Sequence, residues 1–202
     1  MNPGFLTVFI LLFLLILLAT GWRPWLFPGM TRRSLWLWLL GWIALQIVPV
    51  SPVLSIHTAW LNFFYISAGV YGYVRQKVKQ PVMFISSSLL VSSSQFLIQE
   101  ILLVYPTTVP FHPRFVFSLI FSVLAIMMWN DFFQQLAGIT MALLLSHALF
   151  MYVHQDLRFA DVYGMQFADE WWLSIFLTRM VSIFKQMLAL DLKKEQSNQE
   201  KD

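Results

Sequence analysis

The stretch Val82–Tyr105 reads VMFISSSLLVSSSQFLIQEILLVY and holds a single charged side chain, Glu100. About 20 apolar residues in a helix cross the hydrocarbon core of a bilayer. This stretch is therefore long and apolar enough to span a membrane. The whole chain of 202 residues is 58% hydrophobic and 11% charged, and its mean hydropathy is +0.68. Soluble domains carry about 25% charged residues, so the composition indicates a membrane protein.

Six further apolar blocks extend this pattern, and together they predict an all-α bundle of seven transmembrane helices. The expected spans are residues 4–22, 34–50, 57–74, 82–105, 115–129, 135–153 and 171–190. Prolines mark several turns between them, because proline cannot continue a helix without losing a hydrogen bond. Residues 1–192 are thus expected to form one transmembrane domain in contact with the lipid bilayer, and 193–202 a polar cytoplasmic tail.

The distribution of basic residues predicts the orientation of these spans. Short cytoplasmic loops collect Lys and Arg, whereas translocated loops do not. With the N-terminus outside and the C-terminus in the cytoplasm, nine basic residues lie on the inner side and only Arg114 and Arg158 on the outer side. No basic residue precedes the first apolar block, and Arg23 follows it. This order favours a retained helix over a signal peptide.

Tryptophan positions agree with the expected spans. The amphipathic indole ring prefers the headgroup level of a membrane. Eight of the nine tryptophans lie near an expected span end: Trp22, Trp25, Trp36, Trp38, Trp60, Trp129, Trp171 and Trp172. Only Trp42 lies deeper. The sequence therefore predicts tryptophan belts at the two membrane faces.

A polar stripe runs along the expected helix 82–105. It comprises Ser88, Ser92, Gln95 and Gln99, which recur at i, i+4, i+7 and i+11 and so share one helix face. Lipid disfavours such a face, so we expect it to turn inward. One interpretation is packing, since small hydroxyl residues let helices approach and glutamines bond across the contact. The other is a hydrophilic permeation path or substrate cavity.

Glu100 is the only carboxylate well inside an expected span, near its outer end. An ionisable group at that depth is a functional candidate by default. Its expected partners are Arg114, Arg158 and the histidines. The two interpretations are a structural pair at the outer interface and a proton or cation site.

The four histidines, His57, His112, His147 and His154, are all expected on the outer half, as are Asp156, Asp161, Asp169 and Glu170. Such a collection can bind a divalent metal or respond to pH. However, no two histidines have metal-ligating spacing on one helix, and His147 lies two turns, about 10 Å, from His154. The chain also has no cysteine. We therefore expect interfacial histidines, with neither a metal nor another cofactor.

The last expected helix carries a second polar stripe, made of Ser174, Thr178, Ser182, Lys185 and Gln186. Such a helix either spans the membrane with its polar face toward the bundle or lies in the interface, which leaves six spans. We favour spanning. Lys185 can then reach the headgroups, and Arg179, at the edge of the stripe, can pair with Asp131 or a backbone carbonyl.

Two pairs of small residues one turn apart suit close helix contacts: Ala68 with Gly72, and Gly138 with Ala142. Hydrolase elbows, phosphate-binding glycine loops and paired catalytic carboxylates do not occur in the sequence. These observations favour a protein that acts through helix packing rather than as an enzyme.

Three features of the chain together resemble a known family. They are its length, the short basic turn after the first span, and the stretch Gln95–Glu100 that leads through a proline-containing loop to Arg114. The chain is similar to the YphA-type small multi-spanning membrane proteins of Bacillus-like bacteria. The resemblance implies a multi-pass protein of a bacterial plasma membrane. It assigns no catalytic or binding role to any residue.

Three functional hypotheses follow. The first is a non-catalytic membrane component that contacts a membrane-protein partner or a second copy of itself, as an assembly, envelope or sporulation-related factor. The second is a small transporter or channel lined by Glu100, Gln99, Gln95 and the serines. The third is a membrane-embedded enzyme that uses His57, His112 and His147. A net charge of +3 without a basic arm argues against nucleic acid as a partner.

Overall fold

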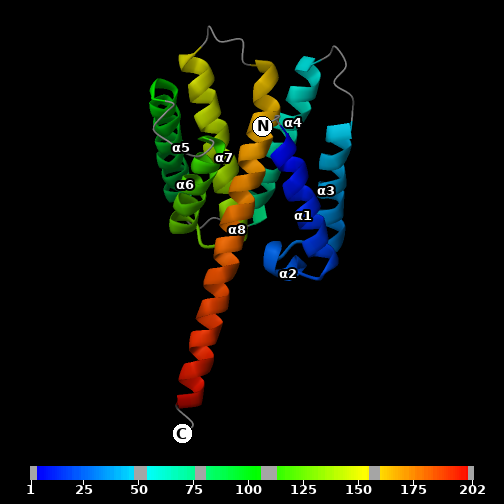
Figure 1. The fold of residues 1–202 in the computed structure, drawn as a ribbon, viewed down its shortest axis with the longest axis vertical. Coiled ribbons are helices and arrows are strands. Elements are labelled where there is room, and N and C mark those ends of the chain that lie inside the picture. The colour runs from blue at the N-terminus through cyan, green and yellow to red at the C-terminus, as the bar shows by residue number, and fades with distance from the viewer. Residues whose placement is uncertain (1–3, 48–53, 76–80, 106–112, 155–159, 200–202) are drawn as a thin grey trace.

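The computed structural model describes residues 4–47, 54–75, 81–105, 113–154 and 160–199, which form helices and no strand. The helices are α1 (Phe5–Ala19), α2 (Arg23–Leu26), α3 (Arg32–Ile47), α4 (Leu54–Arg75), α5 (Pro81–Val104), α6 (Pro113–Met128), α7 (Phe132–Val153) and α8 (Ala160–Gln199). The all-α prediction is confirmed. The long helices lie side by side, and the four-residue α2 sits at one end of the bundle (Figure 1).

Most helix boundaries lie close to the expected spans. The apolar stretch 115–153 divides between α6 and α7, as its polar residues predicted, although α7 already begins at Phe132. The first helix is shorter than expected and ends at Ala19. Gly21 follows with a φ of +90°, a left-handed conformation that glycine adopts without steric strain. The chain then turns into α2.

The last helix departs most from the prediction. α8 has 40 residues, begins at Ala160 rather than 171, and continues to Gln199. The expected loop 154–170 is therefore wrong from residue 160 onward, and most of the expected polar tail is helical. Asp169 and Glu170 were expected on the outer half, before the last span, but both side chains are buried in the bundle.

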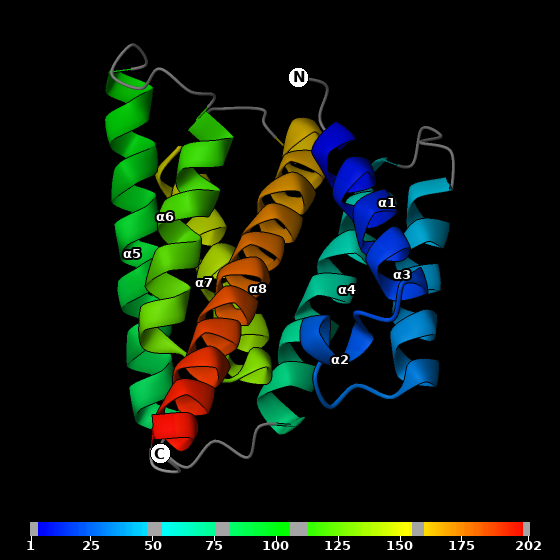
Figure 2. The ribbon, with the colours of Figure 1, turned by 60° about the horizontal axis from the view of Figure 1, so that its bottom comes forward.

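α8 is the central helix of the bundle. It packs against α1, α4, α6 and α7, and Figure 2 shows it between α5–α7 on one side and α1–α4 on the other. Ala168, Trp171 and Thr178 are completely buried. A helix lying flat in a membrane interface keeps one face toward water. α8 is instead buried on several sides, as expected of a helix inside a bundle. The C-terminal part of α8 extends beyond the bundle (Figure 1).

An aromatic cluster fills the space where α3, α4 and α8 meet. The rings of Trp42 and Trp172 lie 5.4 Å apart, and those of Tyr65 and Trp171 lie 4.9 Å apart, between centroids. The Trp42 indole donates a hydrogen bond to the Tyr65 hydroxyl at 3.3 Å. The prediction that Trp171 and Trp172 belong to a surface belt is therefore wrong. Because α8 starts earlier than expected, both residues lie well inside the helix.

α4 and α7 approach each other closely through small residues. A Cβ on Gly72 would lie 2.9 Å from the carbonyl oxygen of Phe133 and 3.2 Å from the amide nitrogen of Ala137. Gly72 of the Ala68–Gly72 pair thus makes a close contact with α7, as expected, and Gly69 adds a second one, with Thr140. Gly138 has another role, since a Cβ there would lie 2.5 Å from the Trp129 indole. Gly138 therefore makes room for the indole ring of Trp129 and not for the backbone of a neighbouring helix.

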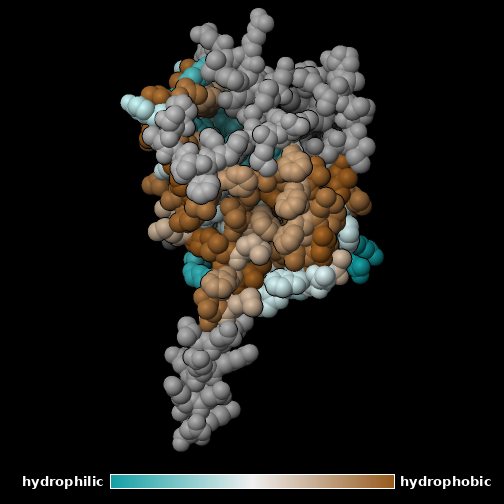
Figure 3. All heavy atoms as spheres, viewed as in Figure 1, coloured by the Kyte–Doolittle hydropathy of each residue, from teal (hydrophilic) through white to brown (hydrophobic). Residues whose placement is uncertain are grey.

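The outer surface of the bundle is apolar. Figure 3 shows a broad hydrophobic zone over the middle of the molecule, above more polar residues at the α2 end. Within the described residues, two helices, α5 and α7, are long and apolar enough to cross a membrane, and α1 and Phe115–Met128 are shorter apolar helices. Exposed side chains such as Leu37, Val82 and Met127 belong to this surface. Lipid solvates them without the cost that water would impose.

Candidate functional site

The polar stripe of α5 turns into the bundle, as the spacing predicted. Ser88 and Ser92 are completely buried, Gln95 is buried, and Gln99 is half-buried. The Ser88 hydroxyl donates to the carbonyl of Phe84 at 2.9 Å within the same helix. The stripe therefore contributes to helix packing along most of its length.

Ser87, directly before Ser88, joins α5 to the turn before α7. The Trp129 indole nitrogen donates to the Ser87 hydroxyl at 3.2 Å. A cavity of about 10 Å³ adjoins Gln95 between α5 and α6. A single water molecule needs about 10–15 Å³ of such volume. The space beside Gln95 is therefore no larger than one water molecule.

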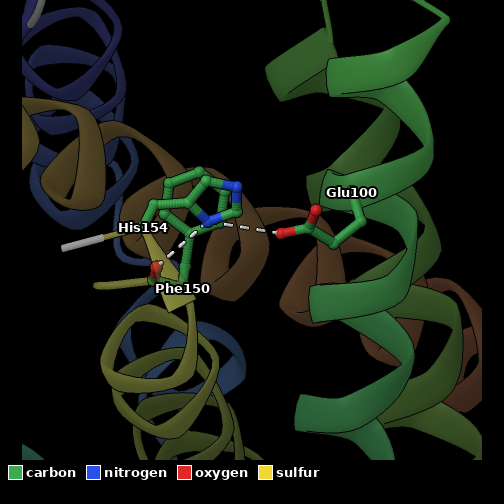
Figure 4. A network of polar contacts seen from close by, with 3 residues as sticks. All are labelled: Glu100, Phe150 and His154. Carbon is green, nitrogen blue, oxygen red and sulfur yellow. Dashed lines mark hydrogen bonds and ion pairs between the residues drawn. The ribbon is translucent and has the colours of Figure 1, made fainter. Parts of the chain in front are cut away.

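Glu100 lies near the C-terminal end of α5 and faces His154, directly after α7 (Figure 4). Its Oε1 is 3.5 Å from His154 Nδ1, and both side chains are partly exposed. The histidine ring stacks on Phe150 with centroids 4.5 Å apart, and Nδ1 lies 3.3 Å from the Phe150 carbonyl oxygen. A histidine was among the partners expected for Glu100. The pair connects the ends of two helices.

The remaining outer candidates do not gather around this pair in the part of the chain that the structure describes. His147 packs edge-on against Phe167 with ring centroids 5.1 Å apart, which joins α7 to α8. Arg114 lies in the first turn of α6 and His57 in α4, but both side chains are outside the described residues, as are His112 and Arg158 altogether. Within the described ranges, no three His, Asp or Glu side chains are placed to hold a metal ion.

Asp169 makes a contact that the sequence did not reveal. Its carboxylate accepts hydrogen bonds from the Gly4 amide at 2.9 Å, the Thr7 amide at 2.8 Å and the Thr7 hydroxyl at 2.5 Å. The first amides of a helix have no partner within it and carry partial positive charge. α1 has neither a capping side chain nor an acidic residue in its first turn. Asp169 of α8 thus supplies the missing cap.

Arg179 makes the second long-range polar contact of α8. Its Nε donates to the Leu26 carbonyl at 3.0 Å, and a terminal nitrogen donates to the Trp25 carbonyl. The guanidinium carbon lies 5.1 Å from the centroid of the Phe132 ring. Of the two partners expected for Arg179, the structure therefore shows backbone carbonyls. Lys185, one and a half turns further on, is exposed.

These two contacts act on one segment of chain from its two ends, and we call them the α8 clasp. Asp169 binds the start of α1, and Arg179 binds the end of α2. The charges complement the partial charges of helix ends, with an anion at amides and a cation at carbonyls. One signal for the clasp was present in the sequence: an apolar helix without a cap of its own needs a partner from elsewhere.

Comparison with known proteins fits this architecture. Residues 4–202 match the family of YphA-like integral membrane proteins. The chain belongs to this family. The family resemblance found in the sequence is thereby confirmed, without its Bacillus-like origin, and this YphA-like chain is an integral membrane protein whose apolar surface faces lipid. No curated protein and no solved structure matches it.

Proposed function

We propose that this YphA-like protein is a multi-pass component of a bacterial cell membrane, with seven spans, an outer N-terminus and a cytoplasmic C-terminus. Seven helices of 15 or more residues correspond one by one to the seven expected spans. The central position of α8 supports its inclusion among them. The short α2, with Arg23, belongs to the basic inner side.

Within the membrane, the protein acts through helix contacts and not through catalysis. The observation that carries this proposal is that polar side chains inside the bundle bind neighbouring helices. Gln135 of α7 donates to the Ser182 hydroxyl at 3.2 Å, and Ser122 of α6 donates to the Ser174 carbonyl of α8 at 3.1 Å. With the α8 clasp, these bonds join most of the helices into one body.

The outward face of α5 is the surface expected to contact a membrane-protein partner or a second copy. α5 packs on α6 and α7, and it exposes Val82, Leu90 and Leu97 on its other side. Between membrane helices the driving force is close packing, because lipid is as apolar as the helix face. An assembly or envelope role follows from such a contact.

Cysteine crosslinking tests the partner contact, since the chain has no cysteine of its own. Leu97→Cys on α5 is expected to crosslink to one defined partner or to a second copy in intact membranes. Val123→Cys, exposed on α6, is the matched control and should give a lower yield. Equal, diffuse crosslinking from both positions would contradict the proposed contact.

The same approach tests the topology. Asn2→Cys is expected to react with a membrane-impermeant maleimide added outside intact cells, whereas Lys194→Cys is expected to react only after the cells are opened. An odd number of spans places the two ends on opposite sides. Labelling of both positions from one side would exclude seven spans.

A second candidate function is a small transporter with a polar path along α5. Ser92 Oγ and Gln95 Oε1 are buried and have no hydrogen-bond partner among the described residues, which favours hydration there. Purified protein in liposomes would then move protons or cations, and Gln95→Leu would abolish the flux. Flux no greater than that of empty liposomes would exclude this function.

A further inference from the structure

An apolar cavity of about 250 Å³ opens between α3 and α4 at the end of the bundle that holds α2. Its inner walls are Phe27, Ala68, Phe132 and Leu136, all of them buried. Trp38 is half-buried and forms a further wall. An apolar cavity of about 150 Å³ in a protein core stays dry and takes up a benzene-sized ligand. This larger cavity has room for several methylene groups.

The mouth of the cavity lies on the surface that faces lipid. Ser67, which lines the cavity, is exposed, and Tyr71, one turn further along α4, is half-buried. On the neighbouring outer surface, α3 exposes Leu40 and α4 exposes Ile66 and Val70. Because these apolar residues face the bilayer, a molecule that enters at Ser67 comes from the bilayer.

Arg75 contacts a residue that lines the cavity, and two further arginines precede another lining residue in the sequence. The Arg75 guanidinium lies over the Tyr71 ring, 5.7 Å from its centroid, and its Nε donates to the Tyr71 hydroxyl at 3.3 Å. Arg32 and Arg33 are exposed and directly precede Ser34, which also lines the cavity.

Among the described residues, the carboxylate of Asp131 belongs to the same end of the bundle. Asp131 is exposed and directly precedes Phe132 of the cavity wall. Among the described residues at this end, the guanidinium groups of Arg32, Arg33 and Arg75, together with Arg23 of α2, outnumber this carboxylate, and the balance is positive. The mouth of the cavity thus combines an apolar entrance with an electrostatic preference for anions.

We propose that the cavity binds one acyl chain of an anionic phospholipid whose phosphate lies beside Arg75. An empty apolar cavity loses the dispersion contacts that its walls would otherwise make. A lipid chain restores these contacts, although it gains little hydrophobic free energy because the bilayer is already apolar. The arginines supply the headgroup preference, about fivefold for each basic residue near a charged headgroup. The site requires only the membrane location shown by family membership and goes beyond the proposed function.

Native mass spectrometry of the purified full chain tests the acyl site. The probes are phosphatidylglycerol and phosphatidylcholine with identical chains, offered in equal amounts. The wild type is expected to retain one phosphatidylglycerol. Ala68→Leu fills the cavity and Ser67→Phe closes its mouth, and each should cause loss of most of the retained lipid, because the acyl chain then loses its dispersion contacts with the cavity walls. Val74→Phe, exposed on the same helix and outside the cavity, is the matched control and should retain the lipid.

Arg75→Gln tests the headgroup contact. This change should lower the ratio of bound phosphatidylglycerol to phosphatidylcholine about fivefold, whereas Arg75→Lys should preserve it. Lys185→Gln removes an exposed cation elsewhere and should leave the ratio unchanged.

Unchanged lipid retention in Ser67→Phe overturns the proposal, and this exposed position decides the matter even if Ala68→Leu fails to fold. Equal binding of the two lipids by the wild type also overturns it. The crosslinking of Leu97→Cys is measured in the same variants. Loss of lipid with intact crosslinking leaves the proposed partner contact standing, so the two proposals fail separately.

Discussion

The contact of α8 with the α1–α2 segment and the contact between α4 and α7 hold neighbouring helices together by different means. In the first, Asp169 and Arg179 bind backbone groups at helix ends. In the second, Gly69 and Gly72 let the α4 backbone approach Thr140, Ala137 and the carbonyl of Phe133. One contact depends on charge and the other on the absence of side chains.

The difference shows what each helix lacks. α1 has 15 residues, no cap of its own and no acidic first turn, so its end needs a polar partner in an apolar environment. α4 and α7 each have 22 residues and can approach along much of their length. Close packing over such a length stabilises a membrane pair without any charge.

Asp169→Ala should cause the largest loss of stability. It leaves the half-buried amide of Gly4 and the buried amide of Thr7 without their acceptor, and a hydrogen bond to a charged group contributes about 1.5–3 kcal/mol. We expect a loss of at least about 3 kcal/mol, because three such bonds disappear together. Unfolding by SDS in mixed micelles measures it. Asp169→Asn keeps one acceptor oxygen and should lose less stability. Equal stability of the alanine variant and the wild type would show that Asp169 does not stabilise the contact between α8 and α1.

Arg179→Met should rank second. Methionine keeps the aliphatic part of the side chain but cannot donate to the carbonyls of Trp25 and Leu26. We expect a loss of about 2 kcal/mol in the same unfolding measurement. Lys185→Met on the exposed part of α8 is the control and should have no effect. Equal free energies of unfolding for the two methionine variants would show that the contact of Arg179 with α2 does not stabilise the protein.

Gly72→Ala tests the uncharged contact. The added Cβ would meet backbone atoms of α7, so the helices must separate, and overpacking costs about 1–3 kcal/mol. Gly41→Ala is the matched control in α3, because its Cβ would have its nearest neighbour at 3.9 Å. Its stability should be unchanged or slightly higher. A tolerated alanine at residue 72 would show that α4 and α7 do not depend on close approach.

Glu100→Gln should have the smallest effect. The pair with His154 is partly exposed, and solvent reduces such an interaction to less than about 1 kcal/mol. A double-mutant cycle with His154→Gln isolates the coupling from other changes. Coupling well above that value would mean that Glu100 has a greater role than the end-to-end contact between α5 and α7.

Several site residues were predictable because their environment follows from local pattern. The spacing of Ser88, Ser92 and Gln95 on one helix face predicted that they turn inward, and they do. A charged group near a span end needs a partner, so a histidine for Glu100 and a carbonyl for Arg179 were reasonable expectations.

Other features depend on residues far apart in the sequence and were not predictable. Asp169 binds Gly4 across 165 positions, and no local pattern connects the two. Trp171 and Trp172, close to Asp169 in the sequence, were expected at a membrane face because they begin the expected span 171–190. In the bundle, backbone amides at the start of α1 donate to the Asp169 carboxylate, so this residue can be buried within α8. Trp171 and Trp172 therefore lie in the core.

The sequence by itself determined that this chain enters a membrane as a set of apolar helices with inward polar faces. That outcome depends on the transfer of each segment from water to hydrocarbon, which is a property of the segment alone. Only the tertiary structure decided that α8 is central, that Asp169 caps α1, and that a cavity opens beside Arg75. These features depend on which helices become neighbours, because a buried polar group is stabilised only by the partner that packing brings within hydrogen-bond distance.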